Sequence, residues 1–143
     1  TMCIETDLRC FRGNHVSSSF THNGDRTVTD IKTRFVWQLE VDGSNPDWVS
    51  AITYCDRLSF GSNSDWRLPN IKELQSITDA GQSSPAINST AFPNTQSAYY
   101  WSSTTYLTDT TIVWSIPFNG VYVYQSRSKS VHTNYVRCVR GGQ

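Results

Sequence analysis

Residues 64–77 read SDWRLPNIKELQSI, and this stretch marks the start of a helix. The Asn70 side chain can accept a hydrogen bond from the first turn, and Glu73 can return one to the Asn70 backbone. Three apolar residues follow at helical spacing and share one face: Ile71, Leu74 and Ile77. The stretch therefore predicts a short helix that packs an apolar face on the rest of the domain.

A second helix is predicted just before this stretch, in SNPDWVSAITYCDRLSF (residues 44–60). Asn45 can cap it, Pro46 suits the first turn, and Asp47 suits the positive end of the helix dipole. Four residues then fall on one face and predict a buried stripe: Trp48, Ile52, Cys55 and Leu58.

Strands are predicted on both sides of the helices. Asn23-Gly24 predicts a two-residue hairpin turn that leads to a further strand at residues 34–39. Later strands are predicted at residues 99–101, 111–118, 121–125 and 135–140, after a long Pro-, Gly- and Ser-containing loop at 80–98. The order of elements predicts an α+β fold, and 143 residues suit a single domain.

The composition sets limits on partners and cofactors. The chain contains no apolar run approaching the ~20 residues that a membrane helix needs, so we expect no membrane insertion. We expect no nucleic-acid partner and no cofactor. No C-x-x-C pair is present and the histidines are scattered, which argues against a zinc site. Asp25 and Asp30 lack the ligand spacing and distal Glu of a calcium loop, so a hairpin is the better interpretation there.

The chain has four cysteines, which allow three disulfide pairings: Cys3, Cys10, Cys55 and Cys138. Disulfides would place the protein outside a reducing cytosol. The alternative is that all four are unpaired, buried thiols.

Several phrases in the sequence occur together in one family: NGDRTVTD, SDWRLPNIKELQSI, PAIN, FPNT, YYWSST and a terminal YVRCVRGG. The chain resembles the Legionella collagen-like adhesin C-terminal domain family from about Thr21 to Gly142. Residues 1–19 form an extension outside this resemblance, and residues 1–143 are treated as one lectin-like ligand-binding domain.

The resemblance implies a C-type-lectin-like fold, with two helices against a small antiparallel sheet and a long irregular loop region. In such folds a disulfide ties the first helix to the last strand, which implies Cys55–Cys138 and leaves Cys3 with Cys10. Calcium-dependent lectins of this fold carry Glu-Pro-Asn or Gln-Pro-Asp and a Trp-Asn-Asp motif. This chain has none of them, so we expect binding without a metal.

The resemblance implies an extracellular or cell-surface location on a bacterium, and an adhesin module that recognises a glycan or another surface polymer of a host or prey cell. Family members often end collagen-like stalks, so a homotrimer, or a trimer-forming cap with little binding of its own, is the alternative. We do not expect an enzyme, because no Ser, Cys or Asp stands in a recognisable nucleophile context.

The stretch RSKSVHTNYVRCVR (residues 127–140) holds cations and no carboxylate, although the chain has twelve Lys and Arg and twelve Asp and Glu. The predicted ligand-binding residues are Arg127, Lys129, His132, Arg137 and Arg140, joined by Tyr122 and Tyr124 on one strand face. If Cys138 points inward, strand alternation turns Arg137 to the opposite face. Arg127, Lys129 and His132 are expected in the connection before that strand, where side chains reach solvent.

These residues would suit an anionic polysaccharide, and relatives in the family are known to bind glycosaminoglycans. Two alternatives stay open. The basic stretch could be neutralised by acids elsewhere in the fold, and the tyrosine face could be covered by a neighbouring chain.

Overall fold

The computed structural model of the protein describes residues 19–79, 81–82, 85–119 and 125–141, and within them it shows two helices and two small antiparallel sheets. One sheet has the strand order β1-β2-β3-β7 and the other β4-β5-β6. The strands are β1 (Phe20–His22), β2 (Thr27–Asp30), β3 (Val36–Gln38), β4 (Tyr99–Thr105), β5 (Ile112–Pro117), β6 (Gln125–Ser128) and β7 (Val139–Arg140). The helices are α1 (Trp48–Asp56) and α2 (Ile71–Gln75). The predicted α+β class is confirmed, with two small sheets where the family resemblance implied one.

Some predictions fall on residues outside the described ranges. They are the Cys3–Cys10 bridge, Tyr122 and Tyr124, and all but the last residue of the strand predicted at 121–125. None of the helices in the described part of the chain has the length and apolar character to cross a membrane.

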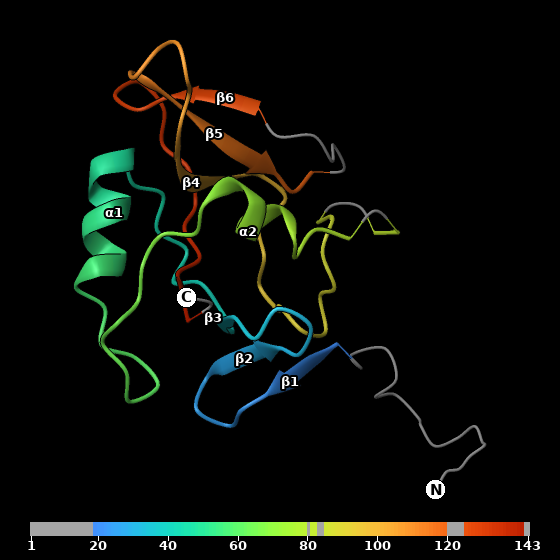
Figure 1. Ribbon diagram of the computed structural model, residues 1–143. Helices are drawn as coiled ribbons and strands as arrows, with labels where there is room; N and C mark the ends of the chain where they lie inside the picture. Colours follow the sequence, from blue (N-terminus) through green and yellow to red (C-terminus); the bar gives the residue numbers. More distant parts are fainter. Residues whose placement is uncertain (1–18, 80, 83–84, 120–124, 142–143) are drawn as a thin grey trace, which may run out of the picture.

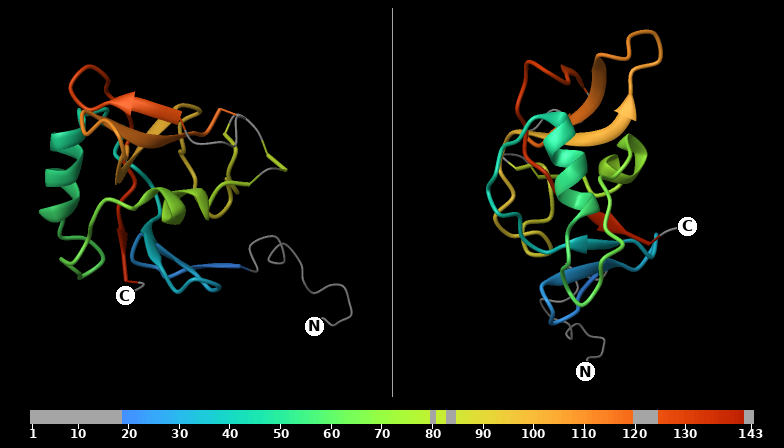
Figure 2. Two further views of the ribbon diagram at one scale, coloured as in Figure 1. Left: turned by 45° about the horizontal axis from the view of Figure 1, so that its top comes forward. Right: turned by 90° about the vertical axis from the view of Figure 1, so that its left-hand side faces the viewer.

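The two sheets lie at opposite ends of the molecule, with α2 between them and α1 at one side (Figure 1). The same arrangement holds in two further views (Figure 2). The C-terminal segment runs from the second sheet to the first, where Val139 of β7 pairs with Trp37 of β3. Before it reaches β7, this segment also pairs with β4 through a parallel bridge between Tyr100 and Tyr135. The basic stretch is therefore shared between both sheets.

The hairpin between β1 and β2 has a longer turn than predicted. Residues 23–26 connect the strands, and Gly24 and Arg26 both adopt positive φ, at 84° and 71°. The Asp25 carboxylate accepts hydrogen bonds from the backbone N–H and the hydroxyl of Thr27, at 3.2 and 2.5 Å. These bonds stabilise a turn that Asn-Gly alone would have closed in two residues, so the two-residue prediction is wrong.

Both helices begin at side-chain caps. In α2, Asn70 accepts from the Glu73 N–H at 2.8 Å and Glu73 accepts from the Asn70 N–H at 2.9 Å, which confirms the predicted capping box. In α1 the cap is Asp47, which accepts from the Ser50 N–H at 2.9 Å, and the predicted cap Asn45 lies two residues outside. Both residues are good caps, so the sequence alone did not choose between them.

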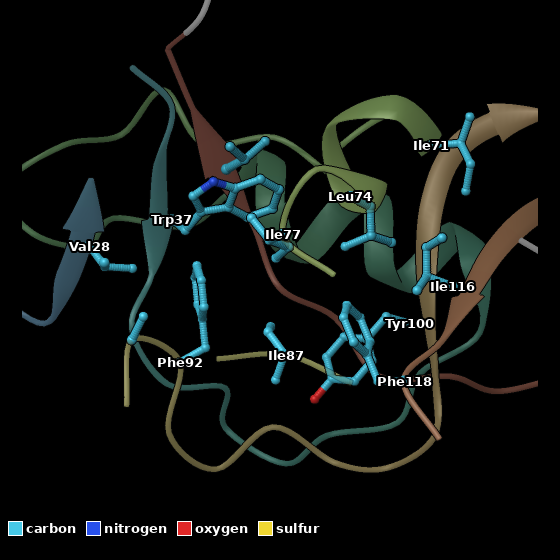
Figure 3. Packing of buried hydrophobic residues seen from close by; sticks show 12 residues of the cluster. Val28, Trp37, Ile71, Leu74, Ile77, Ile87, Phe92, Tyr100, Ile116 and Phe118 are labelled. Carbon is cyan, nitrogen blue, oxygen red and sulfur yellow. The ribbon is translucent and has the colours of Figure 1, made fainter. Parts of the chain in front are cut away.

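The main core lies between the two sheets, and Figure 3 shows its packing. Trp37 of β3 meets Phe92 edge-on with ring centroids 6.4 Å apart, and Tyr100 of β4 meets Phe118 at 5.0 Å. Phe92 and Ile87 are fully buried although they belong to the long loop predicted at 80–98. This loop therefore supplies part of the core as well as the connection.

A second core cluster joins α1 to the C-terminal segment. Ala51 and Cys55 of α1 pack against Trp101, Val136 and Cys138, and all of these residues are buried. Cys55 and Cys138 form a disulfide with their Cα atoms 5.6 Å apart, across a sequence separation of 83 residues. The predicted Cys55–Cys138 bridge is confirmed.

Candidate functional site

The fold divides the basic stretch into residues that hold the structure together and residues that face solvent. Arg137 belongs to the first group, since only 1% of its surface is exposed. Its Nη1 donates to the carbonyls of Gln38 and Leu39, at 2.5 and 2.8 Å, and its Nη2 donates to the Thr95 hydroxyl at 2.8 Å. The guanidinium also lies 5.0 Å from the centre of the Phe92 ring.

The expectation that Arg137 turns to solvent is therefore wrong. The strand predicted at 135–140 is reduced to Val139–Arg140, so Arg137 lies before it, and the loop that carries Phe92 and Thr95 covers its side chain. Burial lowers the pKa of Arg137 to about 10, so the side chain stays charged at neutral pH. The Arg137 guanidinium donates to backbone carbonyls inside the domain, and its burial keeps a ligand from reaching it.

Arg140 is paired with an acid inside the domain. Its Nε and Nη2 donate to the two carboxylate oxygens of Asp65 at 2.6 and 3.1 Å, and Asp65 lies in the stretch that precedes α2. The hydrogen bond from Arg140 lowers the pKa of Asp65, and the same bond raises the pKa of Arg140. The charge of Arg140 is therefore neutralised by an acid elsewhere in the fold, which was one of the two alternatives left open by the sequence.

Arg127 lies in strand β6, not in a connection as predicted, and it is opposite Val113 of β5. Its guanidinium carbon is 4.0 Å from the centre of the Tyr99 ring, and its Nη2 donates weakly to Asn134 Oδ1 at 3.4 Å. The side chain is partly exposed. Because an aromatic ring has no net charge, it holds the cation in place without cancelling its charge.

Lys129 is held in a similar way on a second ring. Its Nζ lies 4.1 Å from the centre of the Trp48 ring, and the Trp48 indole N–H is fixed by the Ser102 carbonyl at 2.9 Å. His132 follows three residues later, and its Nδ1 accepts the Ser128 N–H at 3.0 Å. That bond leaves the neutral imidazole with its proton on Nε2.

Arg127, Lys129 and His132 are called the β6 basic group below. Within the described residues no carboxylate lies in ion-pair distance of Arg127 or Lys129, whereas Arg67 and Arg140 each pair with an acid. All three side chains of the group are partly exposed. Of the five predicted basic residues, these three lie in the segment from β6 to residue 132, and Arg137 and Arg140 are held elsewhere in the fold.

A hollow of about 290 Å³ lies beside the β6 basic group. Its lining comes from three segments that are far apart in the sequence, with Asn45, Tyr99, Arg127, Thr133, Asn134 and Tyr135 among the residues. Backbone hydrogen bonds fix its wall, because the Asn134 N–H donates to Pro46 and the Tyr135 N–H donates to Tyr99, at 3.1 and 3.0 Å.

Two N–H donors in this wall have no hydrogen-bond partner among the described residues. They are Nε of Arg127 and Nδ2 of Asn134, and both atoms are buried. Asn134 as a whole is only 2% exposed. Nearly all buried polar atoms in proteins are satisfied, so two unpartnered donors on neighbouring side chains indicate a place where an acceptor binds.

The other hollows carry a different chemistry. One of about 430 Å³ lies along α1 and is mainly apolar, with Val49, Tyr54, Arg57 and Leu58 in its lining. In the part of the chain that the structure describes, no three His, Cys, Asp or Glu residues are grouped as a metal site would require. Arg26 lies over the Phe60 ring in a similar way, 5.3 Å from its centre, but the β6 basic group has two such cations two residues apart and a hollow beside them.

Sequence reasoning missed two parts of this site. Trp48 was assigned only to the core, and Asn134 was not considered. Tyr99 was among the tyrosines predicted as candidates for ligand contact, but its contact with Arg127 was not predicted. Each acts through a residue distant in the sequence, such as Trp48 with Lys129. The aromatic composition of the chain was a general signal, but nothing in the sequence predicted these pairs.

Comparison with known protein families gives a match over most of the chain. Residues 26–140 match the family described as the Lcl C-terminal domain. No curated protein matches the sequence. The family match begins within the β1–β2 turn and ends with β7, so it covers every strand except β1, both helices and the β6 basic group. The chain therefore belongs to the Lcl C-terminal domain family, a family of domains from collagen-like, adhesin-type surface proteins.

Proposed function

We propose that this domain is the binding module of an extracellular bacterial adhesin, and that it binds an anionic surface polysaccharide through the β6 basic group. The observation that carries the proposal is the state of Arg127 and Lys129. Each cation rests on an aromatic ring, at 4.0 and 4.1 Å, and neither is neutralised by a described carboxylate.

The arrangement suits a repeating anionic polymer for two reasons. Cations already held against rings lose little side-chain entropy when a ligand binds, which favours affinity. A polymer also presents acidic groups at intervals, so that Arg127 and Lys129, which are neighbours on one edge strand and its turn, can contact successive groups. The same geometry supports a binding module better than an enzyme, since it offers charge and shape without a nucleophile.

The test is retention on immobilised heparin at low salt, with two double variants compared with the wild type. Arg127→Glu/Lys129→Glu should abolish retention, because it reverses both unpaired charges. The matched control, Lys32→Glu/Lys72→Glu, changes the net charge by the same amount at two exposed lysines elsewhere and should leave retention largely intact. Wild-type binding should weaken steeply as salt rises. Equal losses in both double variants, or a wild type that is not retained, would contradict the proposal.

We also propose that the fold is C-type-lectin-like, and that binding needs no metal. In support, two helices, a disulfide from α1 to the last segment and a long irregular loop occur together in this chain. The Asp25 and Asp30 carboxylates already accept hydrogen bonds from their own turns. Heparin retention and the melting temperature should be the same in EDTA and in millimolar calcium, and a clear calcium-dependent rise would contradict metal independence.

One observation favours a trimer-forming role as a second candidate. Leu107 and Val131 are 93% and 77% exposed, and they lie in two connections at the same end of the second sheet. These connections meet where the Lys129 N–H donates to the Thr111 carbonyl at 2.9 Å. Light scattering of the domain would show a mass of three chains if this apolar end joins copies of the protein. A monomer mass would leave the adhesin module as the sole function proposed.

A further inference from the structure

The hollow beside the β6 basic group has the properties of a site for one acidic group. Arg127 supplies a full positive charge to its wall, and Arg127 Nε and Asn134 Nδ2 are the two buried donors without partners. The two side chains are already adjacent, since Arg127 Nη2 lies 3.4 Å from Asn134 Oδ1. A buried donor without an acceptor is unfavourable, so an acidic group here would be favoured both by the charge of Arg127 and by the two donors that it would satisfy.

We propose that the hollow is a subsite for a single carboxylate, carried by a uronate sugar of the anionic polymer. The inference rests on the proposed function and adds which acidic group is recognised. One carboxylate oxygen accepts from Arg127 Nε and the other from Asn134 Nδ2. The remainder of the polymer passes over Lys129. Neither donor atom is exposed, so the Arg127 side chain turns on the Tyr99 ring as the ligand enters.

The number of donors favours a carboxylate over a sulfate ester. A carboxylate has two oxygens in one plane, which match a guanidinium edge and a neighbouring amide. A sulfate ester has three terminal oxygens in a pyramid, and this wall offers two free donors among the described residues. The volume of the hollow supports a small ligand. About 290 Å³ is at the lower end of the range for ligand pockets, roughly 300–1,000 Å³, and suits one sugar unit.

The experiment measures binding by calorimetry for three oligosaccharides of similar length: oligogalacturonate, with one carboxylate per sugar, dextran sulfate prepared with one sulfate per sugar so that the charge density is equal, and neutral dextran as the uncharged control. Asn134→Leu keeps the size of the side chain and the net charge but removes the Nδ2 donor. We expect it to weaken oligogalacturonate binding about tenfold, equal to about 1.4 kcal/mol. Dextran sulfate binding should change by less than twofold.

Asn63→Leu is the matched control, because Asn63 lies outside this hollow, in the turn where Phe60 pairs with Asn63, and its Nδ2 donates to the Gly61 carbonyl. It should keep wild-type affinity for oligogalacturonate. A melting curve shows whether each variant folds. If Asn134→Leu does not fold, the wild-type affinities alone still test the subsite. The subsite requires the wild-type domain to bind oligogalacturonate more tightly than dextran sulfate.

The outcomes separate the two proposals. Equal effects of Asn134→Leu on both anionic ligands, or no effect on either, would overturn the carboxylate subsite. So would a wild type that prefers dextran sulfate, although the anionic-polymer proposal would then stand. A wild type that binds neither anionic ligand would overturn the proposed function itself, and the subsite with it.

Discussion

Replacing Arg137 with methionine should destabilise the domain strongly while leaving its ligand surface intact. The change keeps most of the side-chain volume but removes the donors to Gln38, Leu39 and Thr95. Hydrogen bonds to a charged group are each worth roughly 1.5–3 kcal/mol, and leaving two backbone carbonyls and a hydroxyl without their donor should cost about 3–5 kcal/mol in all. We expect a loss of this latter size, because the three bonds are not additive.

The assay is urea unfolding followed by tryptophan fluorescence, with Arg140→Met as the matched control. The urea midpoint should fall. In a thermal melt of a domain of this size, the same loss of about 3–5 kcal/mol corresponds to a fall in melting temperature of roughly 10 °C or more. Arg140→Met removes the same type of side chain three residues away, but its partner Asp65 is exposed. Exposed ion pairs contribute little, so the control should unfold almost as the wild type does.

Heparin retention of folded Arg137→Met completes the test, because a buried structural residue and a ligand-binding residue give opposite results. Retention close to that of the wild type, together with the large loss of stability, is the result expected here. Unchanged stability with lost retention would refute the burial and the hydrogen bonds assigned to Arg137, and would return it to the ligand surface.

Three further predictions concern stability. Reduction of the Cys55–Cys138 bridge with dithiothreitol should lower the free energy of unfolding by about 2–5 kcal/mol, since it closes a long loop between two buried elements, and unchanged calorimetric melting would contradict this. Asn70→Ala should cost about 1 kcal/mol in urea unfolding by removing the α2 cap, whereas no change would show that the capping box is unimportant. The pKa of Asp65 is lowered from 3.8 by Arg140, so its contribution to stability is present above that value and is lost as pH falls through the lower folded pKa. Asp65→Asn should therefore reduce the acid-induced loss of stability in that window, and an identical pH profile would count against the pair.

Local features of the sequence were reliable where a few adjacent residues decide the structure. The capping box of Asn70 and Glu73 and the apolar face of α2 follow from spacing alone, and both are present. The Cys55–Cys138 bridge came from the family resemblance, because four cysteines left three pairings open. The α+β order was also predicted, although the division into two sheets depends on which distant strands pair.

The candidate site was harder to predict because its residues are defined by contacts between distant segments. Alternation along a strand at 135–140 was assumed for Arg137, but the strand holds only Val139–Arg140 and the Phe92 loop covers the Arg137 side chain. Strand β6 was predicted to end near Gln125, so Arg127 was assigned to a connection. The unpartnered nitrogen of Asn134 depends on packing against Arg127 and has no signal in the sequence.

The most direct measurement of the central claim is the NMR map of the surface that contacts an acidic oligosaccharide. A heparin-derived tetrasaccharide is titrated into the isotope-labelled domain, and shifts are followed for backbone amides and for the Trp48 indole N–H. We predict that the largest changes occur in residues 127–135, at Tyr99 and at the Trp48 indole, which surround the unpaired cations Arg127 and Lys129. Changes centred on the α1 hollow around Val49 and Arg57, or no saturable change at low salt, would contradict the account.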